Sequence, residues 1–102
     1  MKLFYQTFGG APVLLLAYAG KGPSGQWDTS STALGVQNFL LAAYAEGLGA
    51  VWTDGVLVKE AEINASLGIE GKKLVSVVPI GYPDEAPRVP PRREGRVQWI
   101  GF

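Results

Sequence analysis

Along the chain, short continuous apolar runs are separated by longer stretches in which the apolar residues have helical spacing. Residues 12–19 (PVLLLAYA) form a continuous apolar run followed by Gly20, which is typical of a buried strand. Residues 49–53 (GAVWT) predict a second, short strand, and residues 74–80 (LVSVVPI) predict a third that is rich in β-branched side chains. Pro79 near the end of the third run favours a sheet edge or a strand terminus.

Two stretches between these runs have helical spacing. Residues 32–46 carry two neighbouring apolar stripes, so the helix is apolar over most of its girth. We therefore expect a buried central helix in which Leu41 is fully buried. Residues 57–68 predict a shorter second helix, with Ile63 and Leu67 facing inward.

The remaining segments connect or end these elements. Residues 21–26 are polar and contain glycine and proline, so we expect a mobile surface loop there. Residues 84–91 are rich in proline and are expected to be extended. The element order is β-α-β-α-β, which indicates an α/β or α+β class. A length of 102 residues fits one domain over residues 1–102.

Composition excludes several kinds of chemistry. The chain contains no Cys and no His, so disulfides, thiolate nucleophiles, Ser-His triads and thiolate or imidazole metal sites are impossible. Nine basic and nine acidic residues give a net charge of zero, which does not favour a nucleic-acid partner. No segment is long enough to cross a membrane as a helix. An enzyme built from this chain would depend on carboxylates, Lys, Tyr or a cofactor.

The first residues have weak features of a secretory signal. Lys2 precedes an apolar stretch over residues 11–19, and residues 17–19 (AYA) are similar to a cleavage site. Glycines and a proline between residues 9 and 12 interrupt the region. We therefore expect a cytoplasmic protein.

The arginines are the least random feature of the composition. All four lie between Arg88 and Arg96, on a segment stiffened by proline. Guanidinium groups bind phosphate in a bidentate manner, so this cluster suits a phosphate ligand. A solvated tail that keeps the terminus soluble is the alternative, and the residues by themselves favour it.

Two further features could belong to a site. In Trp52-Thr53-Asp54-Gly55 a strand ends in a small turn, which can present backbone N–H groups to a flat ligand that Gly55 allows to approach closely. An ordinary strand-to-helix connection is the alternative. Residues 37–38 (QN) are amides in a mostly apolar helix, where they either bond to a neighbouring backbone or line a cofactor pocket.

In their order and spacing, these segments resemble the C-terminal half of the nitroreductase family. The resemblance rests on residues 37–43 (QNFLLAA), residues 47–52 (GLGAVW) and residues 80–83 (IGYP), and it covers roughly residues 9–100. It implies an α+β, partial nitroreductase-like fold with a central buried helix, a mixed sheet and an extended C-terminal tail.

The resemblance also implies a function. It implies an oxidoreductase that binds FMN and transfers hydride from NAD(P)H to nitroaromatic, quinone or flavin acceptors, without a catalytic side-chain acid. The turn of Thr53, Asp54 and Gly55 would run beside the isoalloxazine ring, with the backbone N–H near Asp54 approaching flavin N5. Arg92 and Arg93 would hold the FMN phosphate.

The resemblance further implies a homodimer in which the terminal segment, here residues 97–102, wraps around the second subunit. Pro90 stands where the family often has a lysine just before the phosphate-binding residues. Members of the family also have an N-terminal half, with an Arg/Ser motif for the FMN phosphate, to which Met1–Phe8 does not correspond. The alternative function is therefore a non-catalytic remnant, or half of a split flavoprotein that needs a partner chain.

Overall fold

The computed structural model describes residues 8–101, and over this range the chain is built on a three-stranded sheet with the order β1-β3-β2. The strands are β1 (Val13–Ala19), β2 (Gly49–Ala50) and β3 (Lys73–Gly81). Both outer strands run antiparallel to β3. The α+β class is confirmed, but the expected mixed sheet is wrong for the described residues, because every strand pair in them is antiparallel.

Strand β3 forms the core of the fold. Its side chains from Leu74 to Pro79 are buried, since β3 has a neighbour on each edge and helical elements pack against it. Strand β1 pairs with it from Val13 opposite Ile80 to Ala19 opposite Lys73. The N-terminal end of β1 is exposed, so the buried strand expected from its apolar run is buried only toward Ala19.

Pro79 lies in the central strand rather than at a sheet edge, two residues before the end of β3. On the β2 side, pairing has the same register before and after this residue. Gly49 faces Gly81 on one side of it, and Thr53 faces Val77 on the other. The missing N–H of proline falls between these pairs, which explains why the ladder stops after two residues of β2 and resumes only as an isolated bridge.

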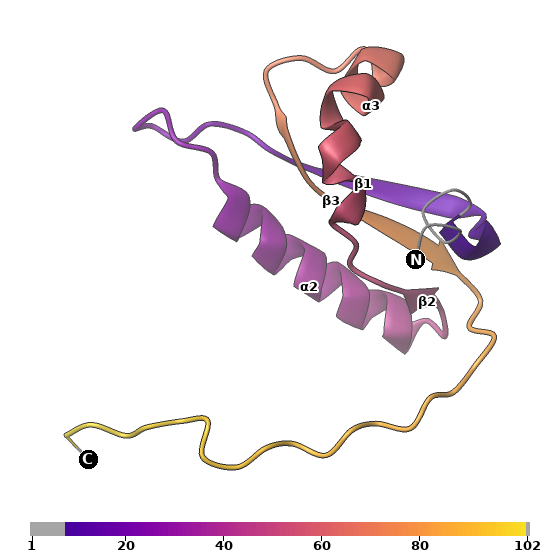
Figure 1. Cartoon of the computed structure of the whole chain (residues 1–102), viewed down its shortest axis with the longest axis vertical. Helices are drawn as coiled ribbons and strands as arrows, with labels where there is room; N and C mark the ends of the chain where they lie inside the picture. Colours follow the sequence, from indigo (N-terminus) through magenta and orange to yellow (C-terminus); the bar gives the residue numbers. More distant parts are fainter. Residues whose placement is uncertain (1–7, 102) are drawn as a thin grey trace.

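Helix α2 (Thr29–Ala45) packs along β1 and also contacts β2 and β3 (Figure 1). Of its two apolar stripes, the one that contains Val36 and Ala43 is buried against the sheet. The other stripe, which we call the outer face of α2, faces solvent and consists of Leu34, Leu41 and Tyr44. Leu41 is 58% exposed, so the expectation of a fully buried Leu41 in a buried helix is wrong for the isolated chain. A sheet on one side covers one stripe of a helix only.

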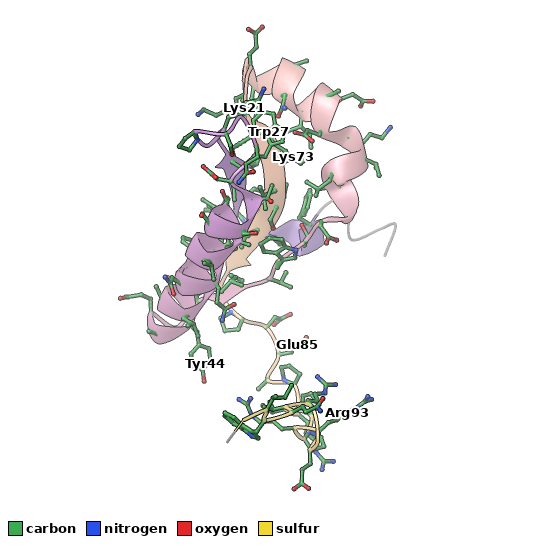
Figure 2. The ribbon with its side chains drawn as sticks, turned by 90° about the vertical axis from the view of Figure 1, so that its left-hand side faces the viewer. Lys21, Trp27, Tyr44, Lys73, Glu85 and Arg93 are labelled. Carbon is green, nitrogen blue, oxygen red and sulfur yellow. The ribbon has the colours of Figure 1, made fainter. Side chains whose placement is uncertain are left out.

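The second predicted helix is a 3-10 segment followed by a short α-helix, η2 (Gly55–Lys59) and α3 (Glu60–Leu67). Figure 2 shows α2 and α3 on opposite sides of the sheet. Ile63 is half-buried, but Leu67 is exposed, so only one of the two side chains expected to face inward does so.

Two side-chain hydrogen bonds join α3 to the sheet. The Tyr18 hydroxyl donates to Asn64 Oδ1 at 2.7 Å, and the Leu74 N–H donates to Glu60 Oε2 at 2.7 Å. Burial raises the pKa of Tyr18 above its ordinary value, and the nearby Glu60 carboxylate raises it further. Both bonds lie at the end of the sheet where β1 ends and β3 begins.

Residues 20–28, which include the surface loop expected over residues 21–26, form a hydrogen-bonded hairpin. Lys21 pairs with Trp27 in an antiparallel bridge, and the Gly22 N–H donates to the Gln26 carbonyl at 2.7 Å. The Lys21 ammonium lies 5.0 Å from the centroid of the Trp27 ring, within the range of a cation–π contact (Figure 2).

The chain after Tyr82 has no helix or strand up to residue 101, so the predicted extended tail is confirmed. It passes the C-terminal end of α2, where Tyr44, Pro83 and Val89 are among the residues that line one groove, and then continues away from the sheet (Figure 1). Val97, Trp99 and Ile100 are exposed there. Residues 1–7 and Phe102, which belong to the predicted domain and tail, lie outside the described residues.

Candidate functional site

Thr53 is fixed to the central strand by several hydrogen bonds. Its N–H donates to the Val77 carbonyl and its carbonyl accepts from the Val77 N–H, each at 3.2 Å. The Thr53 hydroxyl donates to the same Val77 carbonyl, and the Ser76 hydroxyl donates to the Thr53 carbonyl at 3.0 Å. Thr53 is only 6% exposed. Its side chain therefore serves the fold, and a ligand at this turn would meet the residues that follow it.

The next peptide group presents its N–H to the outside of the sheet. A peptide is planar and trans, so its N–H points opposite to its C=O. Because the Thr53 carbonyl points at β3, the N–H of Asp54 points away from β3, beyond the outer edge on the β2 side. Among residues 8–101 this N–H has no acceptor, and Asp54 is exposed. An unpaired N–H on a sheet edge is a donor available to a ligand.

Asp54 and Gly55 form the change from extended chain to helix. The Asp54 carbonyl accepts a hydrogen bond from the Leu57 N–H at 3.0 Å, which closes the first turn of η2. The Asp54 carboxylate makes no capping hydrogen bond. Gly55 is exposed at the start of η2. The turn therefore offers a fixed backbone donor beside a residue without a side chain, which suits a flat ligand with an acceptor atom at its edge.

The arginine cluster lies elsewhere in the isolated chain. Arg92 and Arg93 are exposed in the tail, as are Arg88 and Arg96. Figure 2 shows Arg93 well away from the sheet and both helices. The structure therefore does not bring the two arginines together with the turn of Asp54 and Gly55 within one chain. The side chains of residues 37–38 are exposed on α2, so they are not the buried amides that the apolar helix predicted. Their role in a cofactor pocket stays a prediction.

Ser76 is the residue at this site that sequence reasoning missed. It is fully buried, and its hydroxyl contacts the turn directly. The only signal in the sequence is a single hydroxyl residue in an otherwise apolar run, residues 74–80. The pattern could not show which neighbour this hydroxyl would contact.

Two kinds of feature were not found in the described part of the chain, a metal-binding cluster and a membrane-spanning helix. Within residues 8–101, no group of acidic side chains is arranged so that it could hold a metal ion. In the same part of the chain, no helix is both long enough and apolar enough to cross a bilayer.

Known proteins share sequence and fold with this chain. The model of the nitroreductase family matches residues 1–82. YfhC from Bacillus subtilis, a protein assigned as an NAD(P)H nitroreductase, is 30% identical over 96 residues, which cover 90% of this chain and 50% of YfhC. The family match begins at residue 1, so it includes Met1–Phe8, which the resemblance based on motifs left out.

Solved structures share the fold. A nitroreductase-like protein from Bacillus cereus has a TM-score of 0.78 and 28% identity, over 99% of this chain and 57% of its own. A protein from Desulfovibrio desulfuricans, assigned as a nitroreductase and solved in complex with FMN, has a TM-score of 0.71 and 25% identity, over 83% of this chain and 52% of its own.

A nitroreductase with bound FMN from Bacteroides fragilis has a TM-score of 0.72 at 21% identity, over 88% of this chain and 51% of its own, which shows likeness of fold alone. The chain spans about half the length of the relatives it matches. The family match over most of the sequence, the relative at 30% identity and the shared fold lead to one conclusion, that this chain belongs to the nitroreductase family.

Proposed function

We propose that this chain forms the flavin-ring part of an FMN-dependent oxidoreductase that transfers hydride from NAD(P)H to nitroaromatic, quinone or flavin acceptors. The observation that carries the proposal is the Asp54 N–H, which is fixed by β3 and has no acceptor among the described residues. Membership of the nitroreductase family supports it, as does the FMN complex of the Desulfovibrio desulfuricans relative. The name of the Bacillus subtilis relative supports NAD(P)H as the electron donor.

The residues of the turn fit the edge of a flavin ring. When bound, FMN supplies the atom that accepts and then donates the hydride. The Asp54 N–H would donate a hydrogen bond to flavin N5, and Gly55 would leave room for the ring plane. Thr53 would contribute through its anchored backbone rather than its buried side chain. Because β3 holds this peptide before a ligand arrives, the donor is preorganised.

Binding of the FMN phosphate requires residues that lie outside the turn. Arg92 and Arg93 would bind the dianionic phosphate through charge-assisted hydrogen bonds. Arg93 lies well away from the sheet that anchors the turn in the isolated chain (Figure 2), so we propose that association completes the site. A two-fold homodimer would bring the tail of one chain to the other. The exposed outer face of α2 supports this proposal, because exposed apolar surface favours association.

A second candidate is half of a split flavoprotein, or a non-catalytic remnant, that needs a partner chain. The position of Arg93 in the tail, well away from the sheet, favours this candidate (Figure 2). Here a different chain, rather than a second copy, would cover the outer face of α2 and supply further phosphate contacts.

The colour and activity of the purified protein distinguish the candidates. We expect FMN binding in a fluorescence titration and an FMN-dependent oxidation of NADH or NADPH when a quinone or nitroaromatic compound is added. FMN binding without hydride transfer from either donor would favour the remnant or the split protein. A colourless protein that neither binds FMN nor oxidises NAD(P)H would contradict the proposal for this chain by itself.

A further inference from the structure

We propose that Ser76 is a positioning residue that orients and polarises the peptide between Thr53 and Asp54, so that the Asp54 N–H becomes a stronger donor to a ligand. The inference rests on the proposed flavin site, since it concerns the same N–H. It goes further in assigning a role to a buried hydroxyl that touches no ligand.

The burial of Ser76 is the first observation. Its side chain is fully buried in β3, between Val75 and Val77 in sequence. A buried hydroxyl is unfavourable unless it is hydrogen-bonded, and an apolar side chain would avoid this cost in the core. The single hydrogen bond that the Ser76 side chain makes within residues 8–101 goes to the Thr53 carbonyl. The hydroxyl therefore acts on the turn rather than on packing.

The second observation is that the Thr53 carbonyl accepts two hydrogen bonds. The Thr53 oxygen accepts one hydrogen bond from the Val77 N–H at 3.2 Å and another from the Ser76 hydroxyl at 3.0 Å. Donors on a carbonyl draw electron density through the amide, and hydrogen bonds in such a chain strengthen one another. The N–H at the other end of this peptide belongs to Asp54 and has no acceptor among the described residues.

The third observation concerns the direction in which the Asp54 N–H points. Two donors on one oxygen fix the plane of the peptide more firmly than one donor does. Because the planar peptide sets the N–H opposite to the carbonyl, Ser76 also fixes where the Asp54 N–H points. A ligand that needs a donor at one atom of its rim, as a flavin does at N5, gains from a donor that is already aligned.

The test compares Ser76→Ala with a matched control in the same strand. Val75→Ala also removes a buried side-chain group from β3, but successive side chains of a strand point to opposite faces, and Val75 has no hydroxyl to donate. The full chain is labelled with ¹⁵N, and the amide resonance of Asp54 is recorded before and after adding FMN or riboflavin. Flavin affinity is measured by fluorescence in parallel.

In the unliganded protein, we expect Ser76→Ala to move the Asp54 amide proton upfield, as for a weakened donor, whereas Val75→Ala leaves it in place. We expect Ser76→Ala to weaken FMN and riboflavin binding equally, by about two- to fivefold, because it weakens the hydrogen bond from the Asp54 N–H to the flavin without removing it, and a whole neutral hydrogen bond is worth about tenfold. Val75→Ala should keep both affinities, measured at a temperature where each variant is folded. Ser76→Cys, whose thiol is a weak donor of similar shape, should fall between wild type and Ser76→Ala.

An Asp54 amide unchanged by Ser76→Ala in the unliganded protein would overturn the inference. Equal losses of flavin affinity in Ser76→Ala and Val75→Ala would also overturn it, because they would reflect general loosening of β3. If wild type binds no flavin, the proposed function fails, and the unliganded Asp54 resonance still decides the role of Ser76. If Ser76→Ala does not fold, the same resonance in Ser76→Cys decides it.

Discussion

Thr53 and Val77 exchange two backbone hydrogen bonds of 3.2 Å, and the Thr53 hydroxyl donates to the Val77 carbonyl as well. This pair is an isolated bridge, separated from β2 by the position of Pro79. Between β2 and this bridge the chain does not pair with β3, whereas at the bridge itself three hydrogen bonds join Thr53 to Val77. The turn that follows is thus anchored at one point, immediately before Asp54.

Thr53→Val tests this anchor. The substitution removes the hydroxyl with little change of shape, and the Val77 carbonyl keeps the Thr53 N–H as a donor. We therefore expect a loss of about 0.5–1.5 kcal/mol in the free energy of unfolding, the usual net value of one hydrogen bond. Urea denaturation of both proteins measures it. An unchanged midpoint would show that the hydroxyl adds nothing to the backbone bridge.

Arg92→Ala tests the phosphate contact. A charge-assisted hydrogen bond contributes about 1.5–3 kcal/mol, so the FMN affinity should fall by about one to two orders of magnitude. Riboflavin has no phosphate, so its affinity should hardly change. Arg88→Ala serves as the control, because it removes a guanidinium group from the same tail and should affect neither ligand. Equal losses for FMN and riboflavin in Arg92→Ala would refute the phosphate role.

The two stripes of α2 should respond differently to truncation. Val36→Ala removes two methyl groups from a buried position, which should cost about 1–3 kcal/mol of unfolding free energy. Leu41→Ala changes a side chain that is 58% exposed, so its cost in the dissociated chain should stay within about 0.5 kcal/mol. Denaturation at low protein concentration compares them. A larger loss for Leu41→Ala would mean that the outer face of α2 is covered even under those conditions.

Self-association should depend on the outer face of α2. Figure 2 shows Tyr44 projecting from the C-terminal end of this helix, and its side chain is 81% exposed. We expect light scattering to show a dimer at micromolar concentration. The variant Leu41→Glu should shift the mass toward the monomer, because a charge in an apolar interface is costly. A monomer mass for wild type, with a cooperative melt, would contradict the dimer.

The hydroxyl of Tyr18 should make stability sensitive to alkaline pH. Its pKa is raised in the folded chain above the ordinary value of 10.0, through burial first and Glu60 second. In the unfolded chain the group ionises at the ordinary value, so the unfolded state binds fewer protons than the folded state above that pH. The contribution is therefore complete below about pH 10 and is lost as the pH rises further.

Tyr18→Phe cannot ionise at this position, so its stability should fall less steeply above pH 10 than that of wild type. At neutral pH it should be less stable than wild type, because the hydrogen bond to Asn64 is lost. Thermal melts of both proteins from pH 7 to pH 11 measure the two effects. Parallel curves over the whole range would contradict the raised pKa.

The sequence by itself determined the elements and the family. The apolar run over residues 74–80 specified β3, and the spacing over residues 32–46 specified α2, because strand and helix periods are local properties of the chain. The order of the motifs led to the nitroreductase family. The absence of His and Cys excluded their chemistry without any structure.

Only the tertiary structure decided which groups meet. The two stripes of α2 are both apolar in sequence, and the position of the sheet selected the stripe of Val36 over the stripe of Leu41. Pro79 lies in the central strand, and its missing N–H interrupts the ladder on the β2 side there, which residue preference does not foresee. The Ser76 hydroxyl donates to the Thr53 carbonyl because the strand register places these residues side by side. Register is set by pairing between segments that are distant along the chain. A local pattern records the period of an element, whereas the direction of the Asp54 N–H depends on the neighbour to which the preceding carbonyl is bonded.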